Sequence, residues 1–247
     1  MTLQTFFREN PRAAMGFSGG VDSAYLLWAA HEAGADILPV FVRTAFQPAF
    51  ELADAQRLAA QIGVELMVAE LDILAVPEIA ANPPERCYHC KRRIFEAVTA
   101  AAQARGYSLL LDGTNASDDA GDRPGMRALR ELSVRSPLRE CGLTKDEIRR
   151  LSREAGLFTW DKPAYACLAT RIPAGRALDA DTLWRVERAE DALRALGFSD
   201  LRVRVYHDAA RLQLPSAQLP LLLTKREAVL TALRAEFPAA LLDLETR

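Results

Sequence analysis

The chain has 247 residues, of which half are hydrophobic, and a formal net charge of −2. That length provides for one large or two modest domains with full cores, and the near-neutral charge excludes a global field that would draw the protein onto nucleic acid. No run approaches the roughly 18 apolar residues of a membrane span, and the opening sequence MTLQTFFRENPRAA lacks the pattern of a secretory signal. We therefore expect a cytoplasmic protein that contacts neither membrane nor nucleic acid.

Strands and helices alternate along the first part of the chain. Short apolar runs predict strands at residues 13–17, 37–42, 64–69 and 108–112, and helical periodicity predicts helices from about residue 21 to a stop at Gly34, over 46–62 and over 90–105. This alternation is typical of an α/β fold, in which helices cover both faces of a parallel sheet. Ligands bind beyond the carboxyl ends of such strands, where the strings SGGVDS and GTNASD fall.

The second part of the chain has a different pattern. Residues 121–127, GDRPGMR, are rich in turn residues and predict a loop, whereas Thr144 with Glu147 three residues on predicts a capped helix over 144–155. A loop with two prolines at 161–176 marks a domain boundary, so we divide the chain into residues 1–165 and 166–247. The second domain is expected to be a small α+β unit with helices over about 179–196 and 216–236 and strands over 201–206, 211–214 and 241–244.

The string FSGGVDS at residues 17–23 has the features of an anion-binding loop. Its two glycines allow a tight turn that brings backbone N–H groups near an anion, and the helix that follows adds the positive end of its dipole. A carboxylate in such a loop fits a role in holding Mg²⁺ on the bound phosphates. The alternative is an ordinary glycine-rich turn. The loop residues predicted to bind the nucleotide are Ser18, Gly19, Gly20, Val21, Asp22 and Ser23.

This string differs from the GxxxxGKS/T pattern of P-loop kinases and resembles the PP-loop of N-type ATP pyrophosphatases, such as GMP and NAD synthetases, argininosuccinate synthetase and tRNA thiolases. The resemblance implies a Rossmann-like, adenine nucleotide alpha hydrolase-like fold. It also implies an enzyme that splits ATP into AMP and pyrophosphate and adenylates an oxygen of its substrate. DGTNASD resembles the second motif of this class, which would place Gly113, Asn115 and Asp118 near the nucleotide. Arg127, in GDRPGMR, would reach the ATP phosphates.

The cysteines bear on the nucleophile that attacks the adenylate. Cys87 and Cys90 lie three apart in RCYHCKRRIF, and Cys167 lies in a loop near Lys162 and Arg171, whose charges would favour its thiolate form. In a reducing compartment a CxxC pair favours metal or redox chemistry over a disulfide. A disulfide, an unliganded pair and, for Cys167, a small buried hydrophobe stay open. A zinc site would use Cys87, Cys90 and Cys167 with either His89 or Cys141.

Motifs along nearly the whole chain occur in the order seen in the LarE family, which the chain resembles: SGGVDS, RCYHCKRRIF, DGTNASD, GDRPG, SPL, WDKPAYACLATRIPAG and LRVRV. LarE proteins are ATP-dependent sulfur transferases of nickel-pincer nucleotide biosynthesis. The resemblance implies that the substrate is pyridinium-3,5-biscarboxylic acid mononucleotide, of which a carboxylate is adenylated and converted to a thiocarboxylate. It also implies a homo-oligomer.

The family has two sulfur sources. In one form a cysteine that matches Cys167 gives up its own sulfur. In the other form three cysteines hold a 4Fe-4S cluster that carries an extra sulfide from a sulfide donor. Because Cys87, Cys90 and Cys167 are all present, the resemblance favours the cluster form. We expect Cys141 to be a structural residue, and the alternative is that it completes a set of four cysteine ligands.

The resemblance also assigns charged residues to the active site. The strand pattern LRVRV places Arg202 and Arg204 on one face, where two guanidiniums could grip a phosphate, and the resemblance assigns them to the substrate phosphate. It places Glu190 near the substrate, and Arg171 could neutralise the charge of the adenylate or the substrate. The residues predicted to take part in catalysis are Asp22, Cys167, Arg171 and Glu190.

Other proteins share some of these features. A tRNA thiolase would also pair a PP-loop with cysteines, but it would need a basic surface or an RNA-binding module. An amidating synthetase subunit supplied with ammonia by a partner gives no role to the three cysteines. A non-catalytic nucleotide-binding module would not need Asp22 together with that cysteine set.

Overall fold

The computed structural model describes residues 1–118 and 124–246, which form two compact units. The first unit comprises Met1–Ile73 and Glu85–Lys162, and the second comprises Leu74–Pro84 and Pro163–Arg247. The short segment 74–84 was not expected in the second unit. Its Asn82 side chain explains the assignment, because the amide donates to the carbonyl oxygens of Pro173 at 2.8 Å and Arg176 at 3.1 Å. The functional division at residue 165 stays a prediction.

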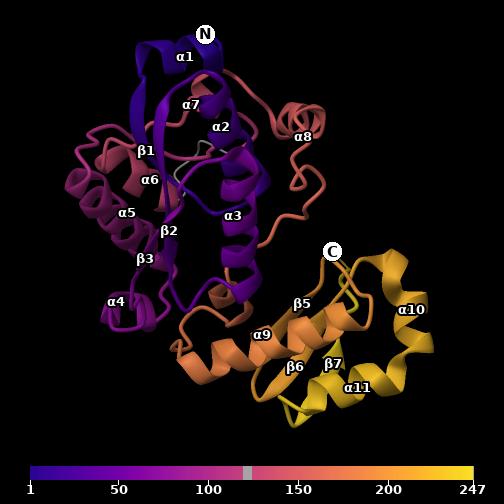
Figure 1. Cartoon of the computed structure of the whole chain (residues 1–247). Coiled ribbons are helices and arrows are strands. Elements are labelled where there is room, and N and C mark those ends of the chain that lie inside the picture. Colours follow the sequence, from indigo (N-terminus) through magenta and orange to yellow (C-terminus); the bar gives the residue numbers. More distant parts are fainter. Residues whose placement is uncertain (119–123, 247) are drawn as a thin grey trace. The chain divides into compact units, whose positions relative to one another are not determined.

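A four-stranded parallel sheet with the order β3-β2-β1-β4 forms the centre of the first unit (Figure 1). The strands are β1 Arg12–Gly16, β2 Asp36–Arg43, β3 Met67–Glu70 and β4 Leu110–Leu111. The helices are α1 Leu3–Glu9, α2 Val21–Glu32, α3 Ala49–Ile62, α5 Arg86–Ala104, α6 Pro124–Glu131, α7 Pro137–Glu140 and α8 Lys145–Glu154. The predicted α/β class is confirmed.

The two faces of this sheet carry separate hydrophobic cores. Side chains alternate along a strand, so Met15 of β1 packs in the core that contains Leu26 of α2 and Leu58 of α3. The neighbouring Ala14 faces the other core, which contains Phe95 and other residues of α5. Burial of both faces explains why the strands read as short continuous apolar runs.

Several element boundaries differ from the predictions. Helix α3 begins at Ala49 rather than residue 46 because Pro48, which is extended, is its N-cap. Helix α5 begins at Arg86, so the CYHC string lies inside its first turns rather than before it. The loop predicted for 121–127 is wrong at Pro124–Arg127, which begin α6, where proline is tolerated at the first position. Residues 121–123 lie outside the described part. The capping box at Thr144 is confirmed.

The second unit is α+β, as predicted. Its strands β5 Arg202–Tyr206, β6 Ala209–Gln213 and β7 Ala239–Leu242 form a sheet in that order, antiparallel between β5 and β6 and parallel between β6 and β7. Helix α9 spans Ala180–Ala195. The other helical segments are α4 Pro77–Ala80, the 3₁₀ turns η1 Leu168–Arg171 and η2 Ser216–Gln218, α10 Leu219–Thr224 and α11 Arg226–Arg234.

The prediction of a single helix over 216–236 is wrong. This segment is divided into η2, α10 and α11, with a break at Lys225, whose backbone is not helical. The Lys225 ammonium donates to the carbonyl oxygen of Leu196 at 2.7 Å, and this contact holds the break against the end of α9. Within the described residues, no helix is long and apolar enough to cross a membrane.

Candidate functional site

The loop between β1 and α2 has the backbone that the glycine pattern requires. Gly19 adopts a left-handed conformation with φ of +67°, and a Cβ atom there would lie 3.2 Å from backbone atoms of Ala55 in α3. Gly20 is the N-cap of α2 and has extended φ and ψ angles. The N-terminal end of α2 therefore lies directly after the carboxyl end of a central strand, the usual position of an anion-binding loop.

Hydroxyl groups brace this loop from within. The Oγ atoms of Ser18 and Ser23 lie 3.2 Å apart, the Ser23 hydroxyl donates to the carbonyl oxygen of Gly20 at 3.1 Å, and the N–H of Gly20 lies 3.4 Å from Ser18 Oγ. Ser23 is buried. These contacts tie both hydroxyl groups to the loop and support its backbone conformation.

Asp22, in the first turn of α2, has two partners from distant parts of the first unit. Lys145 Nζ lies 2.5 Å from Asp22 Oδ2, and Asn115 Nδ2 donates to Asp22 Oδ1 at 3.3 Å. Asn115 is buried, and its own N–H donates to Asp118 Oδ2 at 2.9 Å. The structure therefore joins SGGVDS to GTNASD, as expected, but it adds Lys145, which the sequence reasoning missed. The magnesium role of Asp22 stays a prediction.

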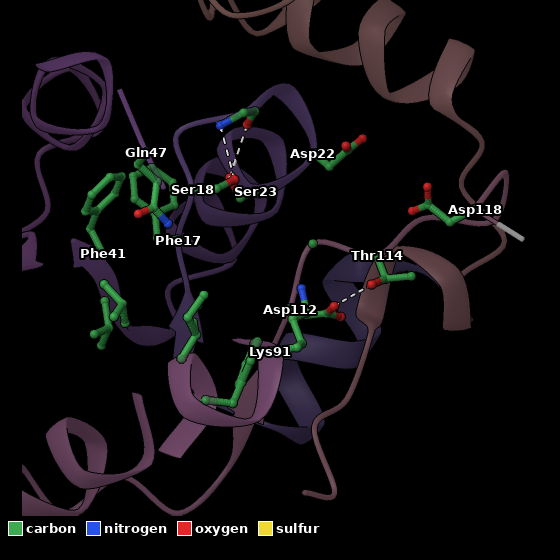
Figure 2. A pocket seen from close by; sticks show the side chains of 17 residues that line it. Phe17, Ser18, Asp22, Ser23, Phe41, Gln47, Lys91, Asp112, Thr114 and Asp118 are labelled. Carbon is green, nitrogen blue, oxygen red and sulfur yellow. Dashed lines mark hydrogen bonds between the residues drawn. The ribbon is translucent and has the colours of Figure 1, made fainter. Parts of the chain in front are cut away.

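A cavity of about 340 Å³ opens at the carboxyl ends of the strands (Figure 2). Its volume lies in the usual range for small-molecule sites. Val40, Phe41, Val42 and Phe95 supply apolar walls, and Asp112 faces it with Thr114, whose hydroxyl donates to that carboxylate. Asp112 also accepts from the Ser136 hydroxyl at 2.6 Å. The predicted nucleotide-binding residues that line this cavity are Ser18, Gly20, Asp22, Ser23, Gly113 and Asp118.

Two cations near this cavity were not assigned to it from the sequence. Lys91 of α5 lines the cavity. Lys162 pairs with Asp54 of α3 at 2.6 Å and lies 3.4 Å from the carbonyl oxygen of Gly19. By contrast, the predicted phosphate ligand Arg127 is exposed and stacks over the Tyr88 ring at 4.0 Å and pairs with Glu131 at 3.7 Å. Its contact with ATP stays a prediction.

The CYHC string lies at the start of α5. Cys87 is exposed and Cys90 is half-buried, and residues three apart share one side of a helix. The Arg86 guanidinium lies 3.9 Å from Cys87 Sγ. Lys91 follows at once and lines the cavity, so this helix links the two thiols to the candidate nucleotide site.

No three histidine, cysteine, aspartate or glutamate side chains are arranged to hold a metal ion among residues 1–118 and 124–246. The predicted set of Cys87, Cys90 and Cys167 draws on both units and stays a prediction. Cys141 packs against the core of the first unit, and burial raises the pKa of its thiol despite the opposing charges of Arg135 and the chain N-terminus. These features fit the structural role that was predicted for it.

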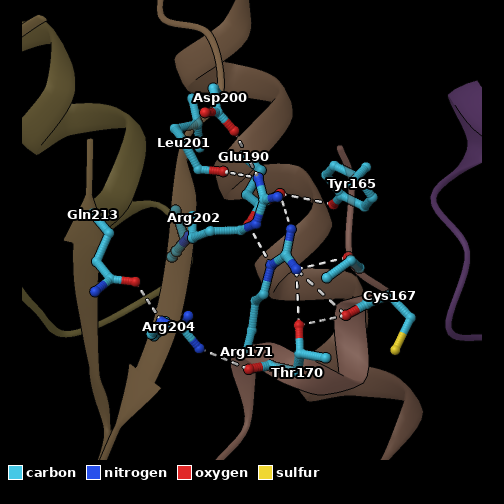
Figure 3. Close-up of polar contacts among 12 residues, drawn as sticks. Tyr165, Cys167, Thr170, Arg171, Glu190, Asp200, Leu201, Arg202, Arg204 and Gln213 are labelled. Carbon is cyan, nitrogen blue, oxygen red and sulfur yellow. Dashed lines mark hydrogen bonds and ion pairs between the residues drawn. The ribbon is translucent and has the colours of Figure 1, made fainter. Parts of the chain in front are cut away.

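In the second unit, a buried arginine holds the loop that carries Cys167 (Figure 3). The Arg171 side chain has no exposed area. Its Nη1 atom donates to the carbonyl oxygens of Ala166 at 2.7 Å and Cys167 at 3.3 Å and to Thr170 Oγ1 at 2.9 Å. The Cys167 sulfur points away from this guanidinium. Arg171 thus contacts the backbone of the cysteine loop.

Glu190 of α9 is the counter-ion of Arg171 and is also fully buried. It accepts from Arg171 Nε at 2.8 Å and Nη2 at 3.2 Å, from the Tyr165 hydroxyl at 2.7 Å and from the N–H of Val203 at 3.0 Å. Burial by itself raises the pKa of the Glu190 carboxyl, but the hydrogen bonds and charge of Arg171 outweigh it, so this pKa lies below its usual value. Burial raises the pKa of Tyr165. The lowered pKa keeps the Glu190 carboxyl ionised at neutral pH.

The two arginines of β5 also contact the loop before α9. Arg202 is buried and donates to the carbonyl oxygens of Leu201 and Ala164, each at 2.7 Å. Arg204 is half-buried and donates to the carbonyl oxygen of Thr170 at 2.9 Å and to the Gln213 side chain. The predicted roles of these arginines toward a substrate phosphate stay predictions.

Comparison with known proteins identifies close relatives. No protein-family model matches the chain. The chain is 39% identical to an uncharacterized protein of Synechocystis sp. over 221 residues, and this alignment covers 88% of this chain and 81% of that protein. The chain is 25% identical to the tRNA-specific 2-thiouridylase MnmA of Clostridium acetobutylicum over 191 residues, and this alignment covers 62% of this chain and 54% of that enzyme.

One relative has a named activity and nearly full-length similarity. The pyridinium-3,5-bisthiocarboxylic acid mononucleotide synthase of Lactiplantibacillus plantarum is 33% identical over 220 residues, which cover 88% of this chain and 80% of that synthase. The α/β fold and the more distant thiouridylases agree with a PP-loop protein. The chain therefore belongs to the LarE family, the family of this synthase, and the resemblance seen in its sequence motifs is confirmed.

Proposed function

We propose that this protein is an ATP-dependent sulfurtransferase that adenylates a carboxylate of pyridinium-3,5-biscarboxylic acid mononucleotide and converts it to a thiocarboxylate. The observation that carries the proposal is the 33% identity to the bisthiocarboxylic acid mononucleotide synthase over 88% of the chain. The braced glycine loop and the cavity beside it support the use of ATP, since both are suited to a phosphate-bearing ligand.

The first unit would activate the carboxylate. The N–H groups of Gly20 and the first turn of α2 would receive the phosphates, and the helix dipole would favour their charge. Asp22 and Asp118, which both line the cavity, would help to hold the Mg²⁺ that accompanies them. Pyrophosphate would leave as the carboxylate oxygen bonds to the α-phosphorus, which produces the acyl adenylate.

The sulfur source that we propose is a 4Fe-4S cluster held by Cys87, Cys90 and Cys167. Cys87 and Cys90 lie one turn apart on α5, with the Arg86 guanidinium beside Cys87, and this spacing supports the choice of these two thiols as ligands. When bound, such a cluster would supply a sulfide, delivered by an external sulfide donor, that replaces AMP on the activated carboxylate. The sacrificial alternative would use the Cys167 sulfur itself.

For the second unit, the contacts support positioning roles. Arg171 and Glu190 are fully buried and bonded to each other and to the backbone around Cys167, so we propose that they hold the cysteine loop in its active shape. Arg204 is half-buried, and we propose that it contacts the substrate phosphate while it holds the Thr170 carbonyl oxygen. We propose that Arg202 acts through the loop at Ala164. A homo-oligomer and a cytoplasmic location stay predictions.

The experiment starts from protein purified without oxygen. Iron, acid-labile sulfide and zinc are measured per chain, and the protein is then incubated with the biscarboxylate mononucleotide, MgATP and sulfide. We expect pyrophosphate release and a product in which sulfur has replaced a carboxylate oxygen, as seen by mass spectrometry. Cys87→Ser, Cys90→Ser and Cys167→Ala should lower the iron content, whereas Cys141→Ser is the matched control and should keep it.

Each part of the proposal has its own contradicting result. Pyrophosphate release only with tRNA would favour the thiouridylase activity of the more distant relatives. No iron, with one product molecule per chain, would replace the cluster by the sacrificial cysteine. Zinc at one atom per chain would support the zinc site instead. No pyrophosphate with any of these substrates would contradict the adenylation step.

A further inference from the structure

We propose that Lys145 holds the Asp22 carboxylate in the nucleotide-free protein and keeps a divalent cation from binding there until phosphate oxygens arrive. The inference rests on the proposed ATP-dependent function and adds that the divalent cation binds together with the nucleotide rather than before it. Lys145 is thus a positioning residue of the phosphate loop, since it acts on the reaction through Asp22.

Both oxygen atoms of Asp22 already have donors. Lys145 Nζ lies 2.5 Å from Oδ2, and Asn115 Nδ2 lies 3.3 Å from Oδ1. The side chains of Asp22 and Lys145 are 23% and 31% exposed, so the pair is partly shielded from water. A cation that approaches this carboxylate therefore meets an ammonium group that already contacts one of its two oxygens.

The backbone fixes Lys145 beside Asp22. The N–H of Lys145 donates to Ser117 Oγ at 2.9 Å, and the N–H of Ser117 donates to Asn115 Oδ1 at 2.8 Å. The capping box of Thr144 holds the start of α8. Asp22, Asn115, Ser117 and Lys145 therefore form a closed ring of polar contacts across three segments of the first unit.

The consequence follows from charge. Mg²⁺ binds carboxylate oxygens at roughly 2.0–2.1 Å, so a divalent cation on Asp22 would lie next to an ammonium that contacts the same group. Two positive charges repel at that range, and the partly buried position weakens screening by salt. Phosphate oxygens placed between them reverse the sign of the interaction, because each cation then faces a negative neighbour. The divalent cation should therefore enter with the nucleotide.

The test measures Mn²⁺ binding to the full chain by electron paramagnetic resonance, with and without a non-hydrolysable ATP analogue. Without nucleotide, we expect Lys145→Met to bind Mn²⁺ tighter than the unmodified protein by roughly tenfold, within the usual range of coupling between two sites. The gain should disappear in the double variant with Asp22→Asn. Lys145→Arg retains the charge and should exclude Mn²⁺ as the unmodified protein does.

Lys162→Met is the matched control. Lys162 also lies at the glycine loop, but it pairs with Asp54 and contacts the Gly19 carbonyl rather than Asp22, so its loss should produce no Asp22-dependent Mn²⁺ site. If Lys145→Met does not fold, Lys145→Gln removes the same charge and is read in the same way.

Two results would overturn the inference by different routes. If the unmodified protein binds Mn²⁺ with the ATP analogue, but Lys145→Met gains no Mn²⁺ site without it, Lys145 does not exclude the cation. If the unmodified protein binds no Mn²⁺ with the analogue, the proposed ATP dependence fails, and the inference fails with it.

Discussion

Replacement of Glu190 by glutamine should strongly destabilise the second unit. The carboxylate accepts from two donors at Oε1, Arg171 Nε and the N–H of Val203. It accepts from three more at Oε2, the Tyr165 hydroxyl, Arg171 Nη2 and Arg194 Nη2. A glutamine has one acceptor oxygen, so in either orientation its NH₂ group faces arginine N–H donors.

The structure sets the size of the effect. Neither Glu190 nor Arg171 has exposed side-chain area, so solvent does not screen the charge left on the arginine. Removal of one partner from a buried pair costs about 3–5 kcal/mol. For a unit of this size, 1 kcal/mol lowers the melting temperature by about 4–8 °C. The lower ends of these two ranges together give a fall of roughly 12 °C in the melting temperature of the second unit.

The measurement is differential scanning calorimetry, combined with hydrogen exchange to locate the change. Exchange should accelerate within residues 163–246, while the first unit and its binding of an ATP analogue stay as in the unmodified protein. Tyr165→Phe is the graded control, because it removes one hydrogen bond to the same carboxylate and retains the ion pair. It should cost about 1.5–3 kcal/mol.

A double-mutant cycle decides whether the pair is the cause. Arg171→Met and Glu190→Gln should each be costly, and together they should cost less than the sum, by about 0.5–3 kcal/mol. Additive losses, or a melting shift of only a few degrees for Glu190→Gln, would refute the reasoning. Glu190 would then be free to act on substrate, as the sequence resemblance first implied.

Three further outcomes are expected. The pKa of Glu190 lies below its usual value, so its contribution to stability is fully present above pH about 4.3 and is lost as the pH falls through the lower folded-state value. Melting curves from pH 7 to 3 should show this loss of stability in acid, and Glu190→Gln should lack it. Gly19→Ala should weaken binding of the ATP analogue. It should also lower the folding stability by about 1–2 kcal/mol from backbone strain alone, with a further cost from the contact at Ala55. Gly34→Ala, at φ of +74° with open space around it, is the control for strain without contact. Cys167→Ala should abolish sulfur transfer while pyrophosphate release continues, and full transfer by this variant would remove the role proposed for Cys167.

The fold was largely predictable because its signals are local. Residues 13–17 and 37–42 are continuous apolar runs, and they form the central strands β1 and β2. The predicted ends of helices and strands were wrong where contacts with another element determine them. The fourth predicted strand shrinks to Leu110–Leu111, whose partners are two residues of β1. The break at Lys225 depends on the carbonyl oxygen of Leu196, which no pattern within 216–236 reveals.

The candidate site was predictable only in part for the same reason. The glycine loop is one continuous string, and its motif gives the backbone and the hydroxyls. The Arg171–Glu190 pair joins residues 19 positions apart, and both residues were singled out from the sequence, but as groups that face substrate. Their burial was not predictable, because a Glu on a helix such as α9 is usually solvated.

Lys145 is one of the site residues that sequence reasoning missed, although the sequence carries one signal for it. Helix N-termini favour negative side chains and disfavour positive ones, because the dipole places partial positive charge there. Lys145 is the first residue of α8, directly after its N-cap Thr144, and so stands where a cation is unfavourable. A residue that breaks a local rule indicates compensation elsewhere, and the compensation is the Asp22 carboxylate, 123 positions away along the chain. The string LTKDE thus predicts a partner for Lys145, but only the fold shows that the partner belongs to the phosphate loop.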